Sequence, residues 1–199
     1  QEANKVLVNE FGSTMYAVVK DVKLQVEFNP AKVQSYRLVG YETRILNNED
    51  FNDDTKDAGE MGAGHTVTAL YEIIPTGISG NIPGSIDPLK YQTETNINTQ
   101  TSNSSELLTV KLRYKTPEEE KSKKIEKSVT DTDKDNVSPD FRFASAVAMF
   151  AQLLKDSDFK GEATYDKVIE TANKGLSFDP EGYRAEFVRL VQSAKGLNK

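Results

Sequence analysis

The spacing of hydrophobic residues changes once along the chain, and that change limits the folds it can adopt. Up to about residue 130, apolar side chains alternate with polar ones in short runs such as 22–28, which is typical of half-buried strands. After residue 137, apolar residues recur every three or four positions, which indicates amphipathic helices. Strands followed by helices predict an α+β fold, with an antiparallel β-sheet or sandwich-like region followed by a C-terminal three-helix subdomain.

The alternating runs predict strands at 15–28, 33–44, 66–74, 108–114 and 121–130. Asn29 and Pro30 end the first strand, and we expect a hairpin between it and the second. The last strand is rich in lysine, which suits an exposed sheet edge, with Ile125 and Val129 pointing inward. Residues 76–106 contain mainly glycine, proline, serine, threonine and asparagine, so we expect a long mobile connection there.

Helix signals follow the strands. Ser138 with Pro139 after it, Thr164, and Asp179 each mark the start of a helix, and Gly175 closes the second one. The residues expected to face the core are Phe141, Phe143, Ala146, Val147, Phe150, Leu153, Leu154, Val168, Ile169, Ala172, Tyr183, Phe187, Leu190, Val191 and Ala194.

The predicted organisation has three parts. Residues 1–14 form the helical tail of an upstream unit, because residues 3–11 have helical spacing and the chain starts without Met or a signal peptide. Residues 15–136 form the β-rich region with the insertion at 76–106. Residues 137–199 form the helical subdomain, which we expect to pack on the β region.

Composition excludes several functions. The net charge of −6 argues against a general nucleic-acid binder. The chain has no cysteine and a single histidine, so disulfides, thiolate sites, cysteine nucleophiles and multi-histidine zinc sites are absent. No run of 18 apolar residues occurs, so no membrane span is expected.

The segment from Asn47 to His65 is unlike the rest of the chain. It contains six acids and three glycines between Glu49 and Gly64. Oxygen side chains at this spacing suit Ca²⁺, although the EF-hand pattern fails, because Thr55 stands where that loop needs glycine and Met61 where it needs glutamate. The alternative is a solvated loop with local Asx turns. The candidate ligand-binding residues are Asp50, Asn52, Asp53, Asp54, Asp57 and His65.

Other constellations are weaker. Asp131, Asp133 and Asp135 begin like a calcium loop but read better as a linker before a helix. The glycines of 59–64 lack the lysine of a phosphate-binding loop, and we expect them to permit positive φ at a turn. His65 is a candidate general base of a hydrolase, but a structural histidine bonded to the acidic loop is the favoured interpretation.

Four segments carry a resemblance to a known family. They are Lys20–Val33, Tyr36–Glu42, Glu49–His65 and Gly182–Phe187. Together they resemble the C-terminal domain of unknown function that follows the von Willebrand factor type A domain in bacterial proteins of the YfbK type. The resemblance covers nearly the whole chain and is weakest over 76–106.

The resemblance implies a cell-envelope setting, periplasmic or outer-surface, because such proteins are often exported and some are lipoproteins. It also implies that the type A domain lies upstream and is a partner. The Asp-x-Ser-x-Ser motif of that domain's metal site is absent here, so no metal ligand is carried over. We expect a non-enzymatic interaction or scaffold module with no cofactor and an unknown protein partner. The alternative is a Ca²⁺ or ligand-binding domain that uses the acidic loop 49–60.

Overall fold

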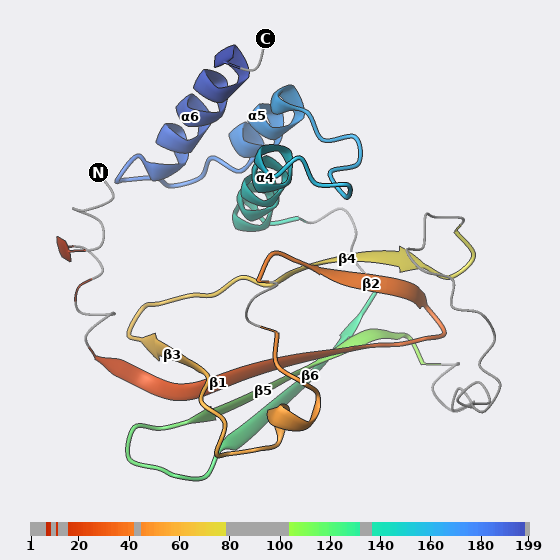
Figure 1. Cartoon of the computed structure of the whole chain (residues 1–199), viewed down its shortest axis with the longest axis vertical. Helices are drawn as coiled ribbons and strands as arrows, with labels where there is room; N and C mark the ends of the chain where they lie inside the picture. Colours follow the sequence, from red (N-terminus) through yellow and green to blue (C-terminus); the bar gives the residue numbers. More distant parts are fainter. Residues whose placement is uncertain are drawn as a thin grey trace. The chain divides into compact units, whose positions relative to one another are not determined.

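The computed structural model describes residues 7–8, 11, 16–41, 45–78, 104–131 and 137–197. The chain divides into two compact units, Gln1–Thr132 and Asp133–Lys199, and each is considered separately below. Antiparallel sheets are followed by three helices (Figure 1), which confirms the predicted α+β class. Most of the predicted tail at 1–14 and of the predicted mobile connection at 76–106 falls outside the described residues. The packing of the helical subdomain on the β region stays a prediction.

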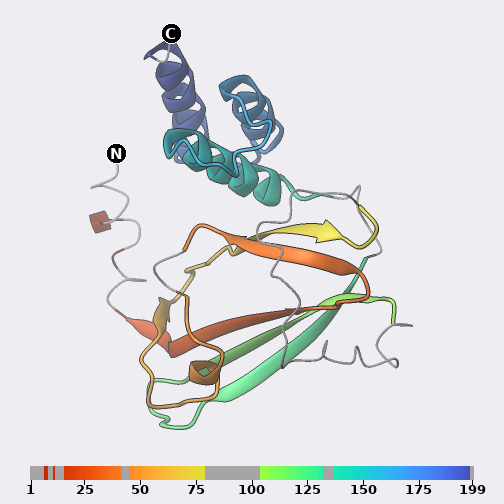
Figure 2. The same ribbon diagram turned by 45° about the vertical axis from the view of Figure 1, so that its right-hand side comes forward.

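The β unit contains two sheets. The larger has the order β3-β1-β5-β6, formed by Gly59–Gly62, Ala17–Phe28, Glu106–Lys115 and Lys123–Thr130, and all neighbours are antiparallel. The smaller pairs β2 (Val33–Val39) with β4 (Leu70–Pro75). Figures 1 and 2 both show the smaller sheet over one side of the larger sheet and the 3₁₀ turn η3 (Glu49–Phe51) toward the other.

The two sheets meet through aromatic rings. The ring centroid of Phe28 lies 4.4 Å from that of Tyr36 and 5.5 Å from that of Tyr71. Phe28 and Val33 are buried, so the sandwich has its core at this end. Because side chains alternate along each strand, the face that carries Phe28 is apolar and the opposite face carries charged residues.

The predicted hairpin between the first two strands is wrong. β1 and β2 are consecutive but belong to different sheets. Asn29 is the reason: its carbonyl accepts hydrogen bonds from the amides of Lys32 and Val33 at 3.0 and 2.9 Å, while its side chain donates to the carbonyl of Glu106 at 2.8 Å. The turn is thus fastened to β5 while the chain leaves for the second layer.

Several predicted strand boundaries also need correction. β2 ends at Val39 because Gly40 and Tyr41 have φ of 80° and 59°, values that a strand does not allow. β4 begins at Leu70 rather than Thr66. In β6, Ile125 and Val129 lie opposite Leu112 and Leu108 of β5 and so share the predicted inner face, but they are 52% and 39% exposed rather than buried.

The helical unit contains α4 (Pro139–Leu154), α5 (Tyr165–Lys174) and α6 (Tyr183–Leu197). The predicted caps are confirmed: the hydroxyl of Ser138 accepts from the amide of Phe141, and that of Thr164 accepts from the amide of Lys167. Asp179 accepts from the amide of Ala185 in the first turn of α6. Among the described residues, no helix is long and apolar enough to cross a membrane.

The core of the helical unit is aromatic at its centre. Phe187 lies edge-on to Phe143 and Phe150, with centroids 5.3 and 5.6 Å apart. The buried residues around them are Ala146, Phe150, Val168, Ala172, Val188 and Val191. Four residues predicted to face the core are instead exposed, namely Phe141, Val147, Leu154 and Leu190.

Candidate functional site

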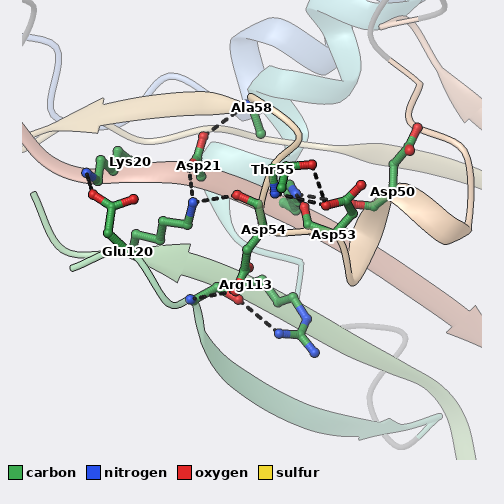
Figure 3. Close-up of polar contacts among 12 residues, drawn as sticks. Lys20, Asp21, Asp50, Asp53, Asp54, Thr55, Ala58, Arg113 and Glu120 are labelled. Carbon is green, nitrogen blue, oxygen red and sulfur yellow. Dashed lines mark hydrogen bonds and ion pairs between the residues drawn. The ribbon is translucent and has the colours of Figure 1, made fainter.

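The acidic loop is fastened to the larger sheet at a bulge in β1. Lys20 pairs with Lys115 and Lys23 with Arg113, so β1 has one more residue than β5 between these pairs. Asp21 lies in this bulge with φ of 53°, a left-handed conformation that aspartate tolerates better than most residues. Its carboxylate accepts from Nζ of Lys115 at 2.8 Å and from the amide of Ala58, at the end of the loop, at 3.2 Å (Figure 3).

Two buried lysines hold the loop backbone. Lys23 is 3% exposed and Lys115 is 5% exposed, and a buried ammonium is costly unless it is hydrogen-bonded. Nζ of Lys23 donates to the carbonyls of Asp50, at 3.1 Å, and of Asp53. Nζ of Lys115 donates to the carbonyl of Asp54 at 2.7 Å. The loop therefore surrounds protein cations with main-chain oxygens.

Arg113 adds a third cation beside the lysines. Its guanidinium lies 5.5 Å from the ring centroid of Phe51 and donates to the side chains of Asn52, at 3.0 Å, and Ser122, at 2.9 Å. Phe51 is buried, so η3 inserts an apolar anchor under the loop. A buried ring and a stacked guanidinium stabilise the same turn.

The side-chain oxygens of the loop point to separate partners. Asp53 accepts from the amide and the hydroxyl of Thr55, which forms an Asx turn. Asp54 accepts from the amide of Ser122 at 3.2 Å, in the connection between β5 and β6. Asp50 accepts from Asn47 at 3.0 Å and lies 3.7 Å from Nζ of Lys56. Figure 3 shows these carboxylates directed apart.

The hydrogen bonds favour ionised carboxylates. The bond from Lys115 lowers the pKa of Asp21, bonds from Thr55 lower the pKa of Asp53, and bonds from Ser122 lower the pKa of Asp54. The carboxylate of Asp21 in turn raises the pKa of Lys115. Each group is thus held in its charged form at neutral pH, which suits a network of ion pairs better than proton transfer.

The predicted ligand residues do not converge on one point. Asp50, Asn52, Asp53 and Asp54 share the loop, but each side chain serves a different neighbour. In the described part of the chain, no three acidic or histidine side chains are grouped to hold a metal ion. His65 is exposed beyond β3, and its imidazole forms no hydrogen bond to the described residues, contrary to the expected bond with the loop.

The glycines of the loop have two roles. Gly59 and Gly62 belong to β3, which pairs with β1 opposite Val22 and Ala17. Gly64 has φ of 76°, so it provides the positive φ expected at the turn. β3 was not predicted, so this pairing is a new finding: the loop follows β2 of the smaller sheet and ends in β3, an edge strand of the larger sheet.

Sequence reasoning missed the four residues that organise the loop, which are Asp21, Lys23, Arg113 and Lys115. The three cations alternate with apolar or aromatic residues, a pattern typical of the water-exposed face of a half-buried strand, so the pattern gave no sign that Lys23 and Lys115 are buried. The available signal was the negative charge of the segment 49–60, because six acidic side chains there favour nearby cations.

Fold and site together define an α+β domain with two antiparallel sheets, a helical C-terminal unit and an acidic loop locked over buried cations. The family model described as "Uncharacterized protein YfbK, C-terminal" matches residues 13–197. The chain belongs to this family, as its sequence motifs indicated.

A curated relative supports the assignment. "Uncharacterized protein YfbK" of Escherichia coli (strain K12) is 39% identical over 196 residues, which cover 98% of this chain. The chain spans 33% of the length of that relative. No solved structure matches the chain significantly.

Proposed function

We propose that this chain is a non-enzymatic interaction module that packs on another domain of a longer bacterial cell-envelope protein. The observation that carries the proposal is the composition of α4. A helix whose apolar surface extends well beyond one stripe is normally buried on more than one side, and the helical unit covers only one side of α4.

The covered side of α4 faces α5 and α6 through Phe143, Ala146, Phe150 and their neighbours. The uncovered side consists of the residues that project from the opposite side of the helix, and we call it the second face of α4. It comprises Phe141, Ala144, Val147, Ala151 and Leu154.

The second face is large for an exposed surface. Phe141 is 52% exposed and Leu154 is 62% exposed, at the two ends of the helix. Between them, the only polar residues of α4 are Arg142, Ser145 and Gln152. Contiguous apolar surface of this kind marks an interaction site on a soluble domain.

The state of the acidic loop supports binding rather than catalysis. A catalytic carboxylate acting as a general acid needs a raised pKa and a reachable substrate. Here the pKa values of Asp21, Asp53 and Asp54 are lowered by their partners. The proposal therefore assigns the loop a structural role with no cofactor.

The proposed partner is the region that precedes this domain in the longer protein. The E. coli relative has two-thirds of its length outside the matched part, which leaves room for a further folded domain. The proposal takes that region to be a von Willebrand factor type A domain and the protein to lie in the cell envelope, as the family resemblance implies.

The test compares the 199-residue chain with the natural polypeptide extended upstream through that domain. Val147→Lys/Leu154→Lys alters the second face, and Leu190→Lys is the control because Leu190 is an equally exposed residue of α6. Both variants should leave the melting temperature of the 199-residue chain nearly unchanged. In the extended protein, the α4 variant should abolish the mutual stabilisation of the two regions and the control should retain it. Independent tumbling of the unaltered regions, with no mutual stabilisation, would contradict the proposal.

A further inference from the structure

An apolar crevice opens between the two sheets of the β unit. Its volume is about 380 Å³, within the range of small binding sites. It is lined by Leu24, Val26, Phe28, Ala69, Tyr71, Ile73, Leu108 and Val110. These residues come from β1, β4, β5 and the approach to β4, and none comes from β2, so β4 is the strand of the smaller sheet that borders the crevice.

The crevice continues onto sheet surface that the described residues of the β unit leave uncovered. The register places Leu24 beside Leu112 and Leu112 beside Ile125, on the same face as the crevice floor. Leu24 is 46% exposed, and Ile125 on β6 is also exposed. A layer of two strands therefore lies over a layer of four, and within the described part of the β unit nothing covers the β5–β6 part of the apolar face.

The two sheets differ in how their open edges are protected. β6 carries Lys123, Lys124 and Lys127, and charged side chains of this kind prevent an edge strand from pairing with another chain. β4 reads Leu-Tyr-Glu-Ile-Ile-Pro, and its single acid, Glu72, is paired with Arg37 of β2. Within the described part of the β unit β4 pairs with β2 alone, so its other edge has no strand partner there and carries no free charge.

We propose that β4 accepts an additional β-strand from the preceding region of the same polypeptide, and that this strand covers the crevice and the exposed apolar residues of β6. Strand addition supplies main-chain hydrogen bonds to an open edge and side chains for the surface beside it. Neighbouring strands lie about 4.8 Å apart, so a strand next to β4 takes the position over β5 and β6.

The residues of this surface also indicate which side chains the added strand should carry. Its inward residues are apolar at alternate positions, to meet Val26, Leu112 and Ile125. Lys127 pairs with Val110 in the register and so faces the same side of the sheet. An acidic residue in the added strand would therefore lie opposite Lys127.

This inference shares one premise with the proposed function, namely a preceding region, but it concerns a different surface. Hydrogen–deuterium exchange of the extended protein separates the two. Protection gained on α4 reports on the proposed function, and protection gained on the open-edge amides of β4 reports on strand addition. In the 199-residue chain alone, the amides on that edge should exchange fast.

The binding probe is a set of overlapping 14-residue synthetic peptides that cover the polypeptide before Gln1, added to the 199-residue chain. One peptide should bind and protect β4. Ile125→Asp should weaken its binding at least tenfold, while Val18→Asp should not, because Val18 is a strand residue with the same exposed fraction, 52%, that does not line the crevice. Lys127→Glu should weaken binding, while Lys124→Glu, on the opposite face, should not.

Three results would overturn the inference. The first is fast exchange of the open-edge amides of β4 in the extended protein, together with no binding of any peptide to the 199-residue chain. The second is full protection of β4 in the 199-residue chain at every concentration. The third is protection that rises with chain concentration together with dimer formation, which would assign the edge to a second copy.

Discussion

Nζ of Lys115 lies 2.8 Å from Oδ2 of Asp21, and this contact joins β5 to the bulge of β1. The same ammonium donates to the carbonyl of Asp54. One side chain thus fixes two strands and the acidic loop together, and its removal leaves a carboxylate and a carbonyl without their donor.

Lys115→Met should destabilise the β unit, because the half-buried carboxylate of Asp21 loses its cation. We expect a lower urea midpoint and faster hydrogen exchange across residues 47–58. Lys111→Met is the control, since Lys111 lies on the same strand and face and pairs with the exposed Glu27 at 2.6 Å. Equal losses of stability in the two variants would show that the contact with Asp21 stabilises the fold no more than the exposed ion pair between Lys111 and Glu27.

Stability should depend on pH through the same groups. The pKa values of Asp21, Asp53 and Asp54 lie below their ordinary value of 3.8 in the folded state. Their contribution to the stability of the fold is therefore fully present above pH 3.8, and it is lost as the pH falls through their lower pKa values in the folded state. The pKa of Lys115 is raised above 10.5, so its contribution is present below 10.5 and is lost as the pH rises through the folded value.

Urea midpoints measured across the acid range test this dependence. Asp21→Asn should flatten the loss of stability in acid, because the substituted side chain does not titrate. Glu118→Gln, in the exposed connection between β5 and β6, is the control and should follow the unaltered chain. If stability fell as steeply with decreasing pH in Asp21→Asn as in the unaltered chain, this carboxylate would be excluded as a source of the pH dependence.

The alternation of apolar residues predicted the fold class and most strands, because burial on one face leaves that pattern in the sequence. It could not assign strands to sheets. Asn29 and Pro30 read as a hairpin turn, whereas the hydrogen bond from the side chain of Asn29 to the carbonyl of Glu106 fastens the turn to β5 and β2 enters another layer. Such a contact between distant residues has no local signal.

Helical spacing had a similar limit on α4. The helix is apolar on both sides, so its period identifies a helix but does not say which side the core occupies. Val147 and Leu154 fit the predicted stripe as well as Phe143 and Phe150 do, yet they are exposed in the structure. The acidic loop was singled out correctly as unusual, but the cations that explain it were hidden in ordinary strand patterns.

Lys23→Met should loosen the acidic loop while preserving most of the side-chain volume. It removes the donor to the carbonyls of Asp50 and Asp53, and an unsatisfied buried acceptor costs about 1–3 kcal/mol. The free energy of unfolding from urea titration checks this value. Lys56→Met is the matched control, because Lys56 is an exposed residue of the same loop, and its loss should change stability by less than about 0.5 kcal/mol.

Gly175→Ala should destabilise the helical unit. A Cβ atom at this position would lie 2.7 Å from the backbone nitrogen of Phe143 and 2.9 Å from its Cα, so α4 and α5 would have to separate. Overpacking of this kind costs about 1–3 kcal/mol. Gly196→Ala, in α6 with open space around it, should be neutral or slightly stabilising. Calorimetry checks whether the melting temperature falls in Gly175→Ala and stays the same or rises slightly in Gly196→Ala.

Calcium at millimolar concentration should leave the melting temperature of the chain unchanged. The main-chain oxygens of Asp50, Asp53 and Asp54 already accept hydrogen bonds from Lys23 and Lys115, and a metal ion would have to displace these ammonium groups. A ligand present at 100 times its Kd stabilises a folded protein by about 2.7 kcal/mol, which calorimetry detects readily. Scans with Ca²⁺ and with a chelator should therefore coincide. A rise with Ca²⁺ that disappears in Asp53→Ala/Asp54→Ala would instead establish the loop as a cation site.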